Sequence, residues 1–270
     1  MPAIDLARLK TQTARLSDHF GQPDVFLHDL QEVLDFYTNR TMRASQVVRR
    51  LSLSTYHTPA PVMRQIEREL IPLAEAQPAE GVNLVYTLWK TAFLETRLLA
   101  ARLLGMIPPI EAMRAFTRLP DWLAESTDKE VRQALLVDAF ARLRRDNPEV
   151  FFFLLEDWLK SPRAALQVWG LQALIPLLTD PGFENLPAAF RILRPAVRHA
   201  GPTTQLDLQA CLVALEQVSL TETLFFLREM LNTDPTPNYL RTLQRILPAF
   251  SPKMQTALRE SLRERGSKPG

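Results

Sequence analysis

Arginine residues gather in three stretches of the chain that contain no Asp or Glu, and this pattern indicates contact with an anion. The stretches cover residues 36–66, 185–206 and 235–259. The planar guanidinium group of Arg binds phosphate through two parallel hydrogen bonds, which makes it the preferred side chain for phosphate recognition. Three basic stretches on one elongated protein therefore predict a groove that follows a phosphate backbone.

The second stretch gives the clearest local pattern, because Arg191, Arg194 and Arg198 are spaced to share one face of a helix. Solvated helix faces explain the same stretches equally well, since Arg near a helix C-terminus complements the helix dipole. If the phosphate hypothesis holds, DNA is the expected partner. The candidate DNA-binding residues are Arg43, Arg49, Arg50, Arg132, Arg191, Arg194, Arg198, Arg241 and Arg245.

Metal, nucleotide and serine-hydrolase chemistry are not expected. The four histidines are scattered along the chain, and none lies in a CxxC or HExxH pattern, so no metal site is predicted. The chain also contains no GxxxxGK[ST], GxGxxG or GxSxG motif. We therefore expect neither a metal nor a small-molecule cofactor.

Tryptophan can stack on a nucleic-acid base, so the position of each of the four is informative. Trp89, Trp158 and Trp169 fall among apolar neighbours at helical spacing and are expected in the core. Trp122 lies in a short segment, 119–126, just before an expected helix. We expect the Trp122 ring to be partly exposed and available for stacking.

Composition indicates a folded protein of a reducing compartment. The formal net charge is +2, which is too small to identify a partner. The single cysteine, Cys211, stands in an apolar run and cannot form a disulfide within the chain. Asp5, Arg8 and Lys10 interrupt any signal-peptide core, and the longest apolar run, 150–155, is too short to span a membrane. We expect a cytoplasmic protein without a membrane partner.

The expected elements are all helices. Glycine is scarce, with 8 residues in 270, whereas many of the 21 prolines stand at apparent helix starts, where proline is well tolerated. No window alternates with a period of two residues, so no strands are expected. Predicted helices include 109–117 and one continuous helix over 128–145. Residues 151–158 are apolar nearly all round, which predicts a helix inside the fold.

Three of these helices begin alike, and the similarity indicates a repeat. Each carries an Arg in its first turns, namely Arg97, Arg132 and Arg163, with steps of 35 and then 31 residues. A repeat of helix pairs at this period is typical of an α-solenoid of HEAT-like antiparallel pairs with a concave groove. We predict one domain over 1–270, with an atypical N-terminal cap (1–60), regular repeats (61–264) and a frayed tail (265–270).

Two segments also resemble the HEAT-like DNA alkylation repair glycosylases. One is Leu88-Trp89 followed by residues 95–104, and the other is Trp122-Leu123-Ala124-Glu125-Ser126 leading to residues 130–135. Trp122 and Arg132 match the second segment by position. The resemblance implies a curved helical solenoid that holds duplex DNA in a basic groove. It also implies excision of cationic alkylated bases, without base flipping, by aromatic side chains and a carboxylate.

The chain departs from that family where catalysis would be expected. The region that should supply the catalytic Asp, residues 106–113, contains none. Glu130-Val131 replaces an expected Trp, and Gln133 replaces a second Arg. The sequence therefore favours a relative without catalytic activity, with Trp122, Asp121 and Glu111 as candidates if activity is retained.

Three functional hypotheses follow. The first is a non-catalytic DNA-binding protein that grips duplex phosphates with Arg in the concave groove. The second is an interaction scaffold that takes a protein or peptide in that groove, which an exposed apolar stripe in place of Arg would favour. The third is an active alkylbase DNA glycosylase that uses Trp122 with Asp121 or Glu111.

Overall fold

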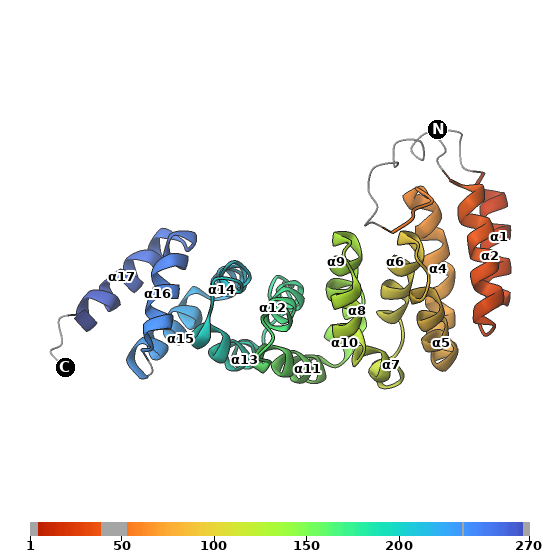
Figure 1. Cartoon of the computed structure of the whole chain (residues 1–270). Helices are drawn as coiled ribbons and strands as arrows, with labels where there is room; N and C mark the ends of the chain where they lie inside the picture. Colours follow the sequence, from red (N-terminus) through yellow and green to blue (C-terminus); the bar gives the residue numbers. More distant parts are fainter. Residues whose placement is uncertain (1–4, 39–52, 234, 267–270) are drawn as a thin grey trace. The chain divides into compact units, whose positions relative to one another are not determined.

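A computed structural model of the protein describes residues 5–38, 53–233 and 235–266, and most of them are helical (Figure 1). The described residues contain no β-strand. Their one extended pairing is an isolated bridge between Ser54 and Phe93. The predicted all-α fold class is therefore confirmed.

The chain divides into two compact units, which we call unit 1 (Met1–Pro148) and unit 2 (Glu149–Gly270). Each unit is described separately below. The helices of unit 1 are α1 (Leu6–Asp18), α2 (Pro23–Phe36), α4 (Ala60–Ala76), α5 (Pro78–Trp89), α6 (Leu94–Leu104), α7 (Pro109–Phe116), α8 (Leu119–Glu125), α9 (Lys129–Val137) and α10 (Ala141–Asp146).

Helices of unit 1 lie in two rows. In one row α1 contacts α4, α4 contacts α6 and α6 contacts α9, and Figure 1 shows the last three side by side. In the other row α2 contacts α5, α5 contacts α7 and α7 contacts α10. The apolar faces of both rows meet in a core of fully buried side chains such as Leu84, Leu99 and Phe140. Each helix pair thus buries its apolar stripe only against its neighbours.

Unit 2 repeats the same arrangement. Its helices are α11 (Pro148–Lys160), α12 (Ala164–Leu178), α13 (Leu186–His199), α14 (Gln205–Val218), α15 (Leu220–Thr233), α16 (Pro237–Ile246), the 3-10 helix η1 (Leu247–Ala249) and α17 (Pro252–Gly266). The first row consists of α11, α13, α15 and α17, and the second row of α12, α14 and α16. Within the first row, Phe190 of α13 stacks on Phe226 of α15 with ring centroids 4.8 Å apart.

Polar contacts between neighbouring helices recur at one sequence spacing. In unit 1, Arg102 of α6 pairs with Glu67 of α4, 35 residues away. In unit 2, Gln172 donates to Asp207 at 3.0 Å, again across 35 residues. A third pair, Arg194 of α13 and Glu229 of α15, also spans 35 residues. These three contacts match the step between Arg97 and Arg132, and other polar contacts between helices span 33 to 40 residues, as in Arg228 with Ser261 and Arg245 with Gln205.

The prediction of one helix over 128–145 is wrong, because the chain breaks between α9 and α10. The Ala134 carbonyl accepts hydrogen bonds from both Asp138 N, at 2.8 Å, and Ala139 N, at 3.0 Å, so the regular ladder ends there. The break lies against Gly105 at the end of α6, and an added Gly105 Cβ would be 1.9 Å from the Asp138 backbone oxygen. Packing against α6, rather than a local signal, stops the helix.

The expectation for α11 needs a similar correction. Phe151, Phe152, Leu155 and Trp158 are buried, as the apolar pattern predicts, but the Phe153 side chain is 65% exposed. The helix has a solvent-facing side despite its composition, because only part of its circumference meets other helices.

Parts of the predicted N-terminal cap (1–60) and of the predicted tail (265–270) lie outside the described residues. Residues 39–52, within the predicted connection of the N-terminal cap, lie outside the described residues, as do residues 267–270 of the predicted frayed tail. Arg265 and Gly266 instead extend α17. A search of the described residues for a helix of sufficient length and hydrophobicity to cross a membrane finds none.

Candidate functional site

Three turns of unit 2 lie next to one another, each where a first-row helix ends and a second-row helix begins. They join α11 to α12, α13 to α14, and α15 to α16. The Thr236 hydroxyl, which caps α16, donates to the backbone oxygen of Arg198 at 3.2 Å, so the second and third turns touch. The first and second turns share the walls of a cavity. Together the turns form one edge of the unit.

Exposed basic side chains follow this edge. Lys160 and Arg163 flank the first turn, and Arg245 reaches the start of α14, where its Nη1 donates to Gln205 Oε1 at 3.2 Å. Lys160 forms an ion pair with Glu156 at 2.7 Å, but exposed pairs of this kind are weak and can exchange for a phosphate. We define the basic edge as Lys160, Arg163, Arg198, His199, Arg241 and Arg245, all of which are exposed.

The opposite edge of unit 2, where second-row helices end and first-row helices begin, is acidic. Asn185, the N-cap of α13, donates to Glu149 Oε1 at 3.4 Å, and Ser251 N donates to Glu216 Oε1 at 3.1 Å. Lys253 is a basic exception at the start of α17. We define the acidic edge as Glu149, Asp180, Glu184, Glu216 and Glu222. Basic side chains therefore predominate at one edge of unit 2 and acidic ones at the other, with Asp207 in the first turn of α14 and Lys253 as the exceptions.

Helix dipoles explain this polarity for the first row but not for the second. Glu149 lies in the first turn of α11 and Lys160 in its last turn, and both complement the dipole. In the second row, Arg163 is the N-cap of α12, whose first turn has no acidic residue, and Glu216 lies near the C-terminus of α14. Both of these charges oppose the dipole of their helix. Helix stabilisation therefore does not explain the charge of Arg163, whereas Lys160, Arg198, His199 and Arg245 lie in last turns, where basic residues complement the dipole.

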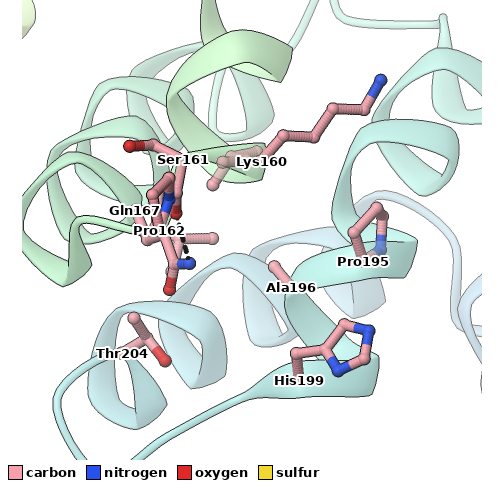
Figure 2. Close-up of a pocket in the computed structure, with 10 residues that line it drawn as sticks. Lys160, Ser161, Pro162, Gln167, Pro195, Ala196, His199 and Thr204 are labelled. Atoms are coloured by element: carbon pink, nitrogen blue, oxygen red, sulfur yellow. Dashed lines mark hydrogen bonds between the residues drawn. The ribbon is translucent and has the colours of Figure 1, made fainter.

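The cavity between the first two turns has a volume of about 360 Å³. Figure 2 shows Ser161, Pro162 and Gln167 on one side of it, with Pro195 and Ala196 of α13 on the other. Its apolar lining comes from Leu159, Pro162, Leu171, Pro195 and Ala196, and its polar lining from Lys160, Ser161, Gln167, His199 and Thr204. No carboxylate is among these lining residues. The cavity therefore combines an apolar wall with a basic rim.

Two polar side chains in the cavity are held in place by hydrogen bonds. Gln167 Nε2 donates to the Ser161 backbone oxygen at 2.8 Å, and the Thr204 hydroxyl donates to the Gly201 oxygen at 3.2 Å. The bond of Gln167 fixes the orientation of its amide and leaves Oε1 as an acceptor, with the second N–H as a donor. The Gln167 amide can therefore recognise the polar edge of a ligand.

The structure separates the predicted DNA-binding arginines into groups with different surroundings. Arg198, Arg241 and Arg245 belong to the basic edge, whereas Arg191 is exposed farther along α13. Arg194 Nη2 donates to Glu229 Oε2 at 2.8 Å, and its guanidinium lies 5.7 Å from the centre of the Phe226 ring. Arg194 therefore ties α13 to α15, and the shared helix face of the three arginines does not give them a shared role.

The remaining predicted arginines belong to unit 1. Arg132 is exposed in the first turn of α9, where its Nη2 lies 3.5 Å from the Thr127 backbone oxygen. Arg43, Arg49 and Arg50 lie outside the described residues.

Trp122 is not partly exposed, as the sequence suggested, but buried, with 3% of its surface accessible. Its ring stacks on Trp89 at 4.7 Å between centroids and meets Tyr86 edge-on at 5.7 Å. The segment around it is helical (α8), which turns the ring into the core instead of toward solvent. Asp121 is exposed and pairs with Arg118 at 3.3 Å, and Glu111 is exposed on α7. In this conformation the Trp122 ring cannot stack on a base.

Residues of the family-like segments pack on one another in unit 1. The Arg97 guanidinium lies 4.8 Å from the centre of the Trp89 ring, and its Nε donates to the Thr91 backbone oxygen at 3.0 Å. Burial lowers the pKa of the Arg97 guanidinium, while the Glu125 carboxylate acts in the opposite direction. These contacts place Arg97 and both tryptophans in a structural cluster.

Glu95, the first residue of that segment, anchors the extended residues 53–59. It is 5% exposed, and its Oε1 accepts from the Thr55 hydroxyl at 2.7 Å and from Thr58 N at 3.3 Å. Glu95 Oε2 and His57 Nε2 are buried and have no hydrogen-bond partner among the described residues. His57 has a positive φ of 52°, which few residues other than Gly adopt without support. We interpret the Glu95 carboxylate as the anchor that supports this backbone conformation.

Replacing Glu95 with alanine should destabilise unit 1 by about 2 kcal/mol, because the Thr55 hydroxyl and the Thr58 amide would lose their acceptor. The Glu95→Gln variant keeps an acceptor oxygen and should lose clearly less. Urea unfolding of the two variants measures the difference. Equal losses would contradict an anchoring role for the Oε1 acceptor.

Several residues of the basic edge and the cavity were not among the sequence candidates, namely Lys160, Ser161, Arg163, Gln167, His199 and Thr204. One sequence signal for them exists. The helix start Ser161-Pro162-Arg163 has a basic residue where an acidic one would favour the helix, so its charge needs a reason other than helix stability. No local pattern in the sequence predicts that Pro195, Ala196 and His199 of α13 line the cavity.

No group of three or more His, Cys, Asp or Glu side chains within the described residues has the placement of a metal site. Comparisons of the chain with models of known protein families and with curated protein sequences find no match. The resemblance to the DNA alkylation repair glycosylases stays a prediction. The side chains of unit 2 provide the evidence on function.

Proposed function

We propose that this protein is a non-catalytic, HEAT-like α-solenoid that binds nucleic acid, with the phosphates on the basic edge of unit 2. The observation that carries the proposal is the placement of Arg163 against the helix dipole, next to other exposed basic side chains. Arg163 is exposed at the N-terminus of α12, next to exposed Lys160. A row of phosphates offsets the electrostatic repulsion between the basic side chains of Lys160 and Arg163.

The basic edge suits a polyanion better than a single small anion. Its side chains come from the first two turns and from α16, next to the third turn, so the basic groups are spread along the edge and not gathered at one point. A phosphodiester chain presents a charge at regular intervals and can bind several such turns at once. Bidentate Arg contacts fix the register of the backbone, and they do so without reading its sequence.

The two other hypotheses receive less support from the side chains. An active glycosylase would need Trp122 at a surface, and that ring is buried against Trp89. An interaction scaffold would need a continuous apolar surface, but the large exposed apolar side chains of the described residues, such as Ile110, Phe153 and Leu206, lie on different helices. Scattered exposed apolar residues are normal on any protein surface.

A triple variant tests the proposal. Lys160→Ala, Arg163→Ala and Arg241→Ala together should weaken binding to a short oligonucleotide and make the slope of log K against log salt less steep by about 3, since each lost phosphate contact contributes about 1. Fluorescence anisotropy at several salt concentrations measures both effects, using a duplex and one of its strands.

The matched control is Lys253→Ala, which removes an exposed basic residue from the opposite edge of unit 2. This variant should bind with the wild-type salt slope. A wild-type protein that binds neither oligonucleotide at low salt would refute the proposal. So would a triple variant whose salt slope equals that of the control.

A further inference from the structure

The cavity of unit 2 stands beside the basic edge, and the two share Lys160 and His199. Its apolar side chains form walls and its polar side chains lie at the rim and the side, and this arrangement suits one kind of occupant. Pro195 and Ala196 of α13 give one apolar wall, and Leu159, Pro162 and Leu171 of α11 and α12 give another. A flat, weakly polar ring fits between such walls, and a hydrated phosphate does not.

Gln167 adds a recognition group at the side of the cavity. Because one of its amide hydrogens is held by the Ser161 backbone oxygen, the remaining N–H and Oε1 have a fixed direction (Figure 2). An amide with one donor and one acceptor matches the edge of a nucleobase. His199, also in Figure 2, brings a flat imidazole to the same cavity, and histidine is one of the side chains on which unpaired bases stack.

Charge complementarity favours an occupant that is attached to phosphate. The cavity rim carries Lys160 and His199, and Arg163 lies one residue beyond Pro162. Glu156 pairs with the rim residue Lys160 at 2.7 Å, and a phosphate would replace Glu156 in this exposed pair, whereas Asp207 accepts from Gln172 at 3.0 Å. A nucleotide that leaves its phosphates on the edge can therefore place its base in the cavity.

We infer that the cavity holds an unstacked base of a single-stranded nucleic acid whose phosphates lie on the basic edge. This inference rests on the proposed function. The volume of about 360 Å³ is at the lower end of the range of small-molecule sites, which is roughly 300–1,000 Å³. A base in a duplex would have to unpair and unstack before it could enter, whereas a base in a single strand is already available. The protein is thus specific for single strands over duplexes.

Filling the cavity tests the inference. We expect wild-type protein to bind a single-stranded oligonucleotide at least about tenfold more tightly than the duplex of the same sequence, because one base is accommodated only from the single strand. Ala196→Trp places a large side chain against the cavity wall and should abolish this preference while retaining salt-dependent binding. Gln167→Ala, a smaller change, should reduce the preference by several-fold. Circular dichroism and thermal unfolding verify that each variant is folded.

A single strand with abasic sites provides a matched ligand, because it keeps every phosphate and lacks the bases. It should bind wild-type protein no better than the intact strand binds the Ala196→Trp variant. Oligo-dT and oligo-U of equal length distinguish DNA from RNA as the source of the base.

The possible outcomes separate this inference from the proposed function. If wild-type protein binds intact and abasic strands equally, and the triple variant of the basic edge still binds less well, the phosphate contacts stand and the base site is refuted. If no oligonucleotide binds at low salt, the proposed function itself is refuted. If both cavity variants fold and keep the full single-strand preference, the cavity is not the base site.

Discussion

Replacing Gly105 with alanine should destabilise unit 1 by about 3 kcal/mol or more, at the upper end of the cost of overpacking a core. The added Cβ would lie 1.9 Å from the backbone oxygen of Asp138 and 2.9 Å from its carbonyl carbon. Both contacts are to main-chain atoms, so a side-chain rotation cannot relieve them. Either α6 or the turn between α9 and α10 must move, and the ion pair of Arg102 with Asp138 must move with it.

Gly201→Ala is the matched control, because a Cβ at Gly201 meets no atom within 4 Å. The free energy of unfolding of this variant should stay within about 1 kcal/mol of the wild-type value. Alanine can even stabilise the protein, because it reduces the conformational freedom of the unfolded chain. Urea unfolding of both variants measures the two effects. A Gly105→Ala protein as stable as Gly201→Ala would show that α6 and the Asp138 turn do not approach as closely as described.

Truncating Phe152 to alanine should cost unit 2 about 3–5 kcal/mol, as expected for a large aromatic side chain in a close-packed core. Phe152 is fully buried, and its ring centroid lies 6.3 Å from those of Phe151 and Phe183. The contact with Phe183 joins α11 to the segment that leads into α13. Loss of the ring therefore leaves a cavity next to both helices.

Phe153, the next residue, supplies the control on the same helix. Its side chain is 65% exposed, so Phe153→Ala should change the free energy of unfolding by less than about 0.5 kcal/mol. Hydrogen exchange adds a second readout, since Phe152→Ala should accelerate amide exchange in unit 2 and Gly105→Ala in unit 1. Equal unfolding free energies for the two Phe variants would contradict the assigned orientation of α11.

Stability and binding can be tested separately because they depend on different side chains. The basic edge lies on exposed turns of unit 2, whereas Gly105 and Phe152 act on packed cores. Alanine at Lys160, Arg163 or Arg241 removes exposed charge and should leave the unfolding free energy nearly unchanged. A loss of nucleic-acid binding in the triple variant would therefore not be a consequence of unfolding.

Local patterns in the sequence were sufficient to predict an all-helical chain and most of its helices. Amphipathic spacing and prolines at the first turn are properties of neighbouring residues, and they gave an all-α fold with helix starts such as Pro148 and Pro252 close to the observed bounds. The step of 35 residues between Arg97 and Arg132 was also visible, and the contacts of Arg102 and Arg194 recur at that spacing. The apolar composition of α11 predicted burial of Phe152 but also of Phe153, which is exposed.

Tertiary contacts decided what the local pattern could not. The helix expected through Asp138 stops because that residue packs against Gly105, and Trp122 is buried because Trp89 of another helix covers it. Arg194 is tied to Glu229 of α15, a carboxylate 35 residues away in the sequence. The cavity beside the basic edge exists because the packing of α11–α14 brings residues of the turns at 161–163 and 200–204 together. Residues that are far apart in the chain make these contacts, so no window of the sequence could contain them.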